Sequence, residues 1–134
     1  MPATLVDSNV LLDYLNEDSE WEDWSAAMIE SASDSGLLAI NPIIYAEVSV
    51  RFATIEALDL ALPSEYFTRA GLPWNASFLA AKAFEQYKRS GGGKTSPLPD
   101  FFIGAHASVA GMTLLTRDAR RYRTYFPKLK IIAP

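Results

Sequence analysis

Residues 4–15 read TLVDSNVLLDYL and contain a transition from strand to helix around one acidic residue. Residues 4–6 form a short aliphatic run, which is typical of a buried strand. Asp7 ends this run, and Ser8-Asn9 then offer an N-cap for a helix that continues to Leu15. A strand that passes directly into a helix is the unit from which parallel sheets are built.

The same alternation continues along the rest of the chain. Residues 63–74 and 91–99 are rich in proline and glycine and are expected to be connections. Short apolar strands that alternate with helices predict one α/β domain over residues 1–134, of the three-layer α/β/α type with a central parallel sheet of four to five strands. The further expected strands are residues 37–40, 113–116 and 130–132, and the further expected helices are residues 20–33, 43–52, 54–62, 75–90, 100–110 and a short basic helix from residue 119.

Composition excludes several classes of protein. A hydrophobic fraction of 49% with 21% charged residues is ordinary for a globular chain and argues against disorder. The chain has no cysteine, so disulfide frameworks, zinc–thiolate sites and thiol nucleophiles are excluded. The first residues do not resemble a signal peptide, and the longest stretch without Asp, Glu, Lys or Arg, residues 101–116, is short for a membrane span. We therefore expect a cytoplasmic protein that does not enter a membrane.

Charge is distributed unevenly between the two halves of the chain. Residues 1–65 contain 13 acidic residues and one basic residue, a sum of −12. Residues 66–134 contain 11 basic and three acidic residues, a sum of +8. This asymmetry indicates an anionic partner for the second half, whereas the overall pI of about 4.9 argues against indiscriminate binding of nucleic acid.

Four acidic residues occupy positions that suit a site at one edge of the sheet. Asp7 and Asp118 follow buried strands directly, and ligands bind α/β sheets at the carboxyl ends of strands. Glu47 lies in the helix just beyond the carboxyl end of another strand. Asp100 opens the helix before the strand that leads to Asp118, so we expect its helix to begin near the opposite end of the sheet. It would then reach the site only if residues 91–99 fold over.

Each acid taken alone has an ordinary structural explanation. Asp7, Asp100 and Asp118 fit turns or helix caps, and Glu47 fits an i,i+4 pair with Arg51. Taken together, clustered carboxylates repel one another unless a cation compensates their charge. An all-oxygen donor set without cysteine or paired histidines suits Mg²⁺ or Mn²⁺.

Basic residues flank two of these acids and are candidates for binding a phosphodiester backbone. Arg117, Arg120 and Arg121 surround Asp118, and Lys94 lies in the loop before Asp100. Any one of them also fits an ordinary solvated helix face.

Four pieces of the sequence, in this order, resemble the acidic motifs of PIN-domain ribonucleases, and the short single-domain build resembles VapC, the toxin half of a toxin–antitoxin pair. The resemblance covers nearly the whole chain. The pieces are Leu5-Val6-Asp7-Ser8-Asn9, Tyr45-Ala46-Glu47, Pro99-Asp100-Phe101-Phe102-Ile103-Gly104-Ala105 and Leu115-Thr116-Arg117-Asp118.

The resemblance implies both an activity and its partners. The four acids would be the Mg²⁺-binding catalytic residues, with Mn²⁺ as a substitute, and Asn9 and Thr116 would support them. The substrate would be tRNA, rRNA or mRNA, cut by a metal-activated water to leave 5′-phosphate and 3′-hydroxyl ends. A homodimer and a cognate VapB-like antitoxin are also implied.

Two features depart from the family pattern. Many relatives carry another acid after the fourth motif, whereas residues 119–123 are basic here, which leaves the number of metal ions, one or two, open and favours RNA contact. His106, the only histidine, lies six residues after Asp100 and off its helical face, so we expect a packed or partly exposed side chain rather than a catalytic one.

Other functions fit the sequence less well. Gly93-Lys94-Thr95 resembles the end of a P-loop, but Lys88 stands where the first glycine of that motif belongs. A receiver domain or a haloacid-dehalogenase-type phosphatase would need a second acid close after Asp7, where Ser8-Asn9 stand. The remaining alternative is a PIN-like module that binds RNA or a protein without cutting, which would gain nothing from clustered negative charge beside a phosphate backbone.

Overall fold

The computed structural model describes residues 3–93 and 97–134, which form one α/β domain. Five parallel strands make a single sheet in the order β3-β2-β1-β4-β5. The strands are β1 (Ala3–Val6), β2 (Leu37–Ile40), β3 (Phe67–Arg69), β4 (Thr113–Leu115) and β5 (Ile131–Ile132), and the helices are α1 (Ser8–Tyr14), α2 (Glu22–Ser35), α3 (Pro42–Ser49), α4 (Ile55–Ala61), α5 (Trp74–Arg89), α6 (Leu98–Ala110) and α7 (Arg120–Tyr125).

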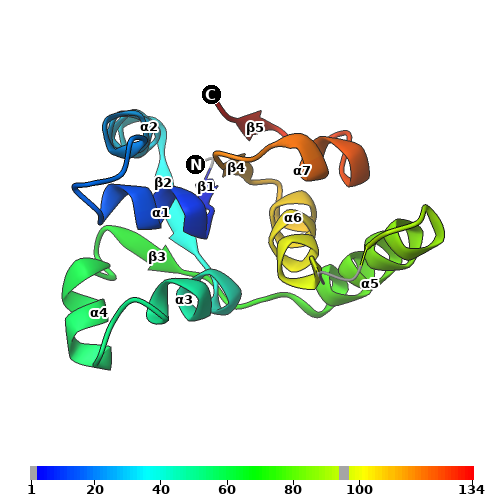
Figure 1. Ribbon diagram of the computed structural model, residues 1–134, viewed down its shortest axis with the longest axis horizontal. Coiled ribbons are helices and arrows are strands. Elements are labelled where there is room, and N and C mark those ends of the chain that lie inside the picture. Colours follow the sequence, from blue (N-terminus) through cyan, green and yellow to red (C-terminus); the bar gives the residue numbers. More distant parts are fainter. Residues whose placement is uncertain (1–2, 94–96) are drawn as a thin grey trace.

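The strand order creates a switch point beside β1. From β1 the chain adds β2 and β3 on one side, and it later adds β4 and β5 on the other. Val6 at the end of β1 is level with Leu115 at the end of β4. At such a point the connections leave in opposite directions and open a crevice outside the carboxyl ends of the strands. Figure 1 shows α1 and α2 to the left of these two strands and α5, α6 and α7 to the right.

Most elements lie where the sequence predicts them, with shifts of a few residues at their ends. The predicted cap Asn41 accepts a hydrogen bond from Ile44 N, and Thr54 accepts one from Ala57 N. The predicted cap at Ser8-Asn9 is wrong, because Asp7 itself caps α1 by accepting a hydrogen bond from Ser8 N at 2.7 Å.

Strand β3 was expected to be part of a connection. It is a three-residue edge strand, and of its side chains only Phe67 is buried. So short a strand shows no alternation of apolar and polar residues that would predict it. These residues form a strand because they pair with β2.

The packing of α6 against α7 depends on the absence of a side chain at Gly104. A Cβ atom at this position would lie 2.5 Å from a ring carbon of Phe126 and 3.0 Å from one of Tyr122. Gly104 lies one helical turn after Asp100, so this close approach fixes the first turns of α6 relative to α7. No helix among the described residues is long and apolar enough to span a membrane.

Candidate active site: four acids at the switch point

Asp7 is the buried centre of the site, with 3% of its surface exposed. Its carboxylate accepts hydrogen bonds from Ser8 N at 2.7 Å, Thr116 Oγ1 at 2.8 Å and Tyr122 Oη at 2.9 Å. Burial raises the pKa of Asp7 to about 6, the charge of Asp100 adds to the rise, and the hydrogen bonds oppose it. The burial of Asp7 therefore costs free energy whenever its carboxyl group is ionised.

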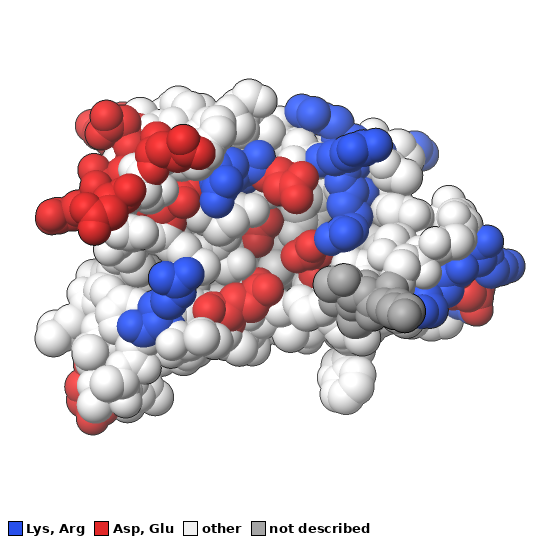
Figure 2. Space-filling view, in the orientation of Figure 1, with Lys and Arg blue, Asp and Glu red and all other residues white. Residues whose placement is uncertain are grey.

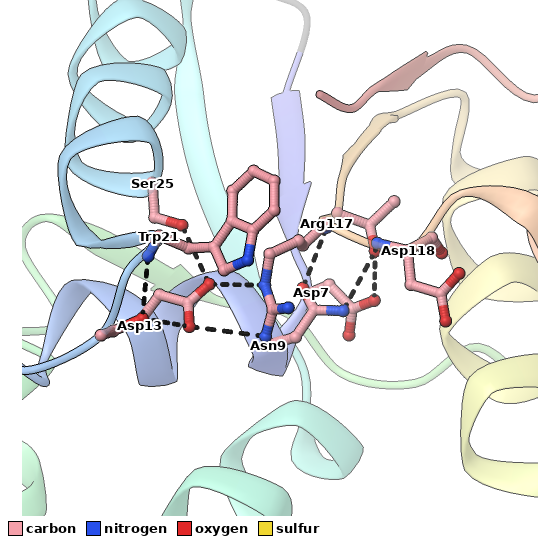
Figure 3. Close-up of polar contacts among 9 residues, drawn as sticks. Asp7, Asn9, Asp13, Trp21, Ser25, Arg117 and Asp118 are labelled. Atoms are coloured by element: carbon pink, nitrogen blue, oxygen red, sulfur yellow. Dashed lines mark hydrogen bonds and ion pairs between the residues drawn. The ribbon is translucent and has the colours of Figure 1, made fainter.

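Thr116 and Asn9 connect Asp7 to the segment that carries Asp118. Thr116 Oγ1 donates to Asp7 and accepts from Asn9 Nδ2 at 3.3 Å and from Asp118 N at 3.2 Å. Asn9 Oδ1 in turn accepts from Arg117 N at 3.1 Å (Figure 3). Both predicted supporting residues therefore lie in the site.

Glu47 extends from α3 towards the beginning of α1. Its Oε1 accepts a hydrogen bond from Ser8 Oγ at 2.9 Å. Among the ion pairs between described residues, none joins Glu47 to Arg51. Burial raises the pKa of Glu47, and the charge of Asp100 raises it further.

Asp100 reaches the site directly, and the expected placement of its helix is wrong. A helix that leads into a parallel strand runs antiparallel to it, so the first turn of α6 lies at the carboxyl ends of β1 and β4. No folding over of residues 91–99 is needed. Asp100 forms an ion pair with Arg121, with Oδ2 2.7 Å from Nη1. Burial raises the pKa of Asp100, Arg121 opposes the rise, and the charge of Asp118 adds to it.

The four acids form one electrostatically coupled group. The charge of Asp100 acts on Asp7 and Glu47, and the charge of Asp118 acts on Asp100. Asp118 is exposed, and no hydrogen bond among the described residues involves its carboxylate. Within residues 3–93 and 97–134, no group of three or more His, Asp or Glu side chains is arranged so that it could hold a metal ion.

The predicted RNA-binding residues differ in their surroundings. Arg120 is exposed on α7, whereas Arg117 and Arg121 form ion pairs with Asp13 and Asp100. Lys94 lies outside the described residues. Figure 2 shows acidic side chains in the middle of one face with a column of basic side chains beside them, on the side of the molecule where α7 lies.

Sequence reasoning missed Tyr122 as a partner of Asp7. Its side chain is buried, and burial together with the neighbouring acids raises its pKa well above the ordinary value. The hydroxyl group therefore keeps its proton and donates a hydrogen bond to Asp7. The only signal in the sequence is its position four residues after Asp118.

His106 is packed as expected: it is buried, and its Nδ1 lies 3.0 Å from Asn41 Nδ2.

The fold and the site together define a class of protein: parallel α/β domains with acidic side chains at the switch point of the sheet. The chain belongs to the PIN domain family, which matches residues 4–127. No curated protein matches the sequence.

Solved structures show the same fold at low sequence identity. A chain of VapBC2 from Rickettsia felis, bound to a promoter DNA fragment, is 16% identical, with a TM-score of 0.74 over 98% of both chains. A chain of VapBC-1 from nontypeable Haemophilus influenzae is 16% identical, with a TM-score of 0.73 over 98% of this chain and 97% of that one. The sarcin–ricin loop cleaving toxin VapC20 from Mycobacterium tuberculosis is 13% identical, with a TM-score of 0.66 over 90% and 94%.

Proposed function

We propose that this protein is a Mg²⁺-dependent endoribonuclease that acts as the toxin of a VapBC-type toxin–antitoxin pair. One observation carries the proposal: Asp7, Glu47, Asp100 and Asp118, far apart in the sequence, form one coupled group of carboxylates at the switch point of a PIN domain. A module that only binds RNA has no use for this negative charge beside a phosphate backbone.

The donor set fits a hard divalent cation. All four side chains offer carboxylate oxygens, which Mg²⁺ and Mn²⁺ prefer. We assign one or two such ions to Asp7, Asp100 and Asp118, with Glu47 as a direct or water-mediated ligand. A divalent charge here would offset both the burial of Asp7 and its repulsion by Asp100. When bound, the cation supplies Lewis acidity and an activated water for attack on an RNA phosphodiester.

The other residues of the site orient these acids and attract the substrate. The hydrogen bonds from Thr116 and Tyr122 fix the position of the Asp7 carboxylate and favour its ionised form. Ser8 holds Glu47 from the first turn of α1. Positive charge for the phosphate backbone is available at Arg120 and, once it leaves Asp100, at Arg121. Lys94 and Arg117 complete the set of residues predicted to contact RNA.

The partners of this chain are proposed from its structural neighbours. Several are toxin–antitoxin complexes, including VapBC2 from Rickettsia felis and a complex from Klebsiella pneumoniae whose matching chain is 20% identical with a TM-score of 0.69. We therefore propose a VapB-like antitoxin and a homodimeric toxin. Large apolar side chains are exposed on the surface: Trp74 is 92% exposed, and Val50 and Leu60 are each 82% exposed. Exposed apolar side chains of this size support the proposal that partner proteins cover them.

The test is cleavage of a mixed pool of tRNA and rRNA by the purified chain. We expect cuts with 5′-phosphate ends in Mg²⁺ that disappear with EDTA and in Asp7→Asn. The matched control is Glu30→Gln, which makes the same acid-to-amide change at an exposed position of α2. Cleavage that survives EDTA and Asp7→Asn, or 2′,3′-cyclic phosphate ends, would contradict the proposal. Retention of RNA without cleavage would favour a binding module.

A further inference from the structure

Asp13 is a buried acid that does not belong to the group of four. Its side chain, on α1, is 9% exposed. Its carboxylate accepts hydrogen bonds from Ser19 Oγ at 2.9 Å and Ser25 Oγ at 3.3 Å, and from Arg117 Nε at 2.7 Å. A carboxylate is costly to bury unless it is paired and hydrogen-bonded, and Arg117 supplies the opposite charge.

Arg117 is held through both its side chain and its backbone. The guanidinium group contacts Asp13 and lies 5.5 Å from the centre of the Trp21 ring. The backbone N–H donates to Asn9 Oδ1 at 3.1 Å. Asn9 and Asp13 are four residues apart on α1, so one face of this helix contacts the backbone and the side chain of Arg117 together (Figure 3).

These contacts bear on Asp118, the next residue in the chain. Because no hydrogen bond among the described residues involves its carboxylate, the position of this group depends on the backbone of residues 116–118. Thr116 attaches this segment to Asp7, and Arg117 attaches it to α1.

We propose that Asp13 and Arg117 are positioning residues for Asp118: they hold residues 116–118 against α1 so that the Asp118 carboxylate stays at the cation site. The inference rests on the proposed function, since it assumes that Asp118 binds a divalent cation. It also assigns the charge of Arg117 to Asp13 rather than to a phosphate group of RNA.

The experiment is a calorimetric titration of Mn²⁺ into the purified full chain and its variants. Asp118→Asn tests the site itself, and Asp13→Asn removes the charge of Asp13 with little change of shape. Asp59→Asn is the matched control, because it breaks another ion pair, to Arg69 at 2.7 Å, in which none of the four acids takes part. Thermal melting of every variant, with the core variant Ile29→Val for comparison, separates a loss of stability from a loss of binding.

We expect Asp13→Asn to weaken Mn²⁺ binding by about 10-fold or more, as is usual when a residue that orients a metal ligand is removed. Asp59→Asn and Ile29→Val should bind Mn²⁺ like the wild type. Because Asp13 and Arg117 act as one unit, Asp13→Asn combined with Arg117→Met should bind no more weakly than the weaker single variant.

Two results would overturn the inference while leaving the proposed function intact. One is wild-type Mn²⁺ affinity in Asp13→Asn although Asp118→Asn loses binding. The other is unchanged Mn²⁺ affinity with tighter RNA binding in Asp13→Asn, which would mean that the released guanidinium group serves RNA. A wild type that neither binds Mn²⁺ nor cuts RNA overturns both. If Asp13→Asn does not fold, Arg117→Lys replaces it, because lysine keeps a positive charge opposite Asp13. We expect Arg117→Lys to bind Mn²⁺ more weakly than the wild type, and wild-type affinity would overturn the inference.

Discussion

Arg121 on α7 and Asp100 on α6 form an ion pair in which 2.7 Å separates Nη1 from Oδ2. Asp100 is also the acid whose charge acts on both Asp7 and Glu47. A guanidinium group therefore compensates the acid that is coupled to the other three. A divalent cation bound to the same carboxylate would repel this group, so the two compete for Asp100.

Removing Arg121 should therefore strengthen binding of the cation. We expect Arg121→Gln to bind Mn²⁺ about 10-fold more tightly, which corresponds to ~1.4 kcal/mol, and to bind RNA more weakly. Calorimetric titration measures the first effect and filter binding the second. Arg123→Gln, an exposed position on the same helix, is the control for loss of a positive charge. Equal or weaker Mn²⁺ binding in Arg121→Gln would show that Arg121 does not compete.

The raised pKa of Asp7 predicts how the stability of the metal-free protein depends on pH. The folded state holds a proton with a pKa of about 6, against 3.8 for the ordinary carboxyl group. Between these two values the folded state binds more protons than the unfolded state, so stability falls as pH rises through this window and then levels off. The free energy of unfolding should therefore be lower at neutral pH than below both pKa values, by on the order of 3 kcal/mol.

Urea unfolding of the wild type and Asp7→Asn from pH 4 to pH 8, both without metal, measures this loss. The free energy of unfolding of the wild type should fall relative to Asp7→Asn as pH rises to about 6. Mg²⁺ should restore stability to the wild type at pH 7 but not to Asp7→Asn. A difference between the two proteins that stays constant with pH would mean that Asp7 titrates normally.

Loss of the hydrogen bond that the Tyr122 hydroxyl group donates to Asp7 should reduce activity. Tyr122→Phe preserves the ring but leaves a buried carboxylate with one donor fewer. We expect a fall in kcat of about 10-fold to 100-fold and a loss of about 1–3 kcal/mol in the free energy of unfolding. Initial-rate kinetics in saturating Mg²⁺ measures the change in kcat. Tyr125→Phe is the control, because Tyr125 lies on the same helix as Tyr122 and its ring packs against Phe101 of α6. Similar kinetics in both variants would contradict this role of Tyr122.

A side chain at Gly104 should disturb the site through the packing of α6 on α7. In Gly104→Val the added carbons would meet the rings of Phe126 and Tyr122. We expect a loss of about 1–3 kcal/mol in the free energy of unfolding together with weaker Mn²⁺ binding, because Asp100 is displaced from Arg121 and Asp7. Ala110→Val, at the exposed end of α6, is the control. Unchanged melting of Gly104→Val would show that α7 adjusts freely.

Local sequence was sufficient for the elements that hold Asp7 and Glu47. The apolar runs of β1 and β2 and the Asn41-Pro42 helix start are visible in single segments, because burial of a strand and capping of a helix depend on neighbouring residues. The three-residue edge strand β3 has no such signal, because it is a strand only through its pairing with β2.

The sequence by itself therefore determined an α/β domain with acids at the ends of its strands, since hydrophobic periodicity and residue type are properties of short segments. Only the tertiary structure decided that α6 runs antiparallel to the sheet and brings Asp100 to Asp7, that Tyr122 donates to Asp7, and that Asp13 pairs with Arg117. These contacts join residues about 90 to 115 positions apart, and their geometry is set by the packing of whole elements around a shared core.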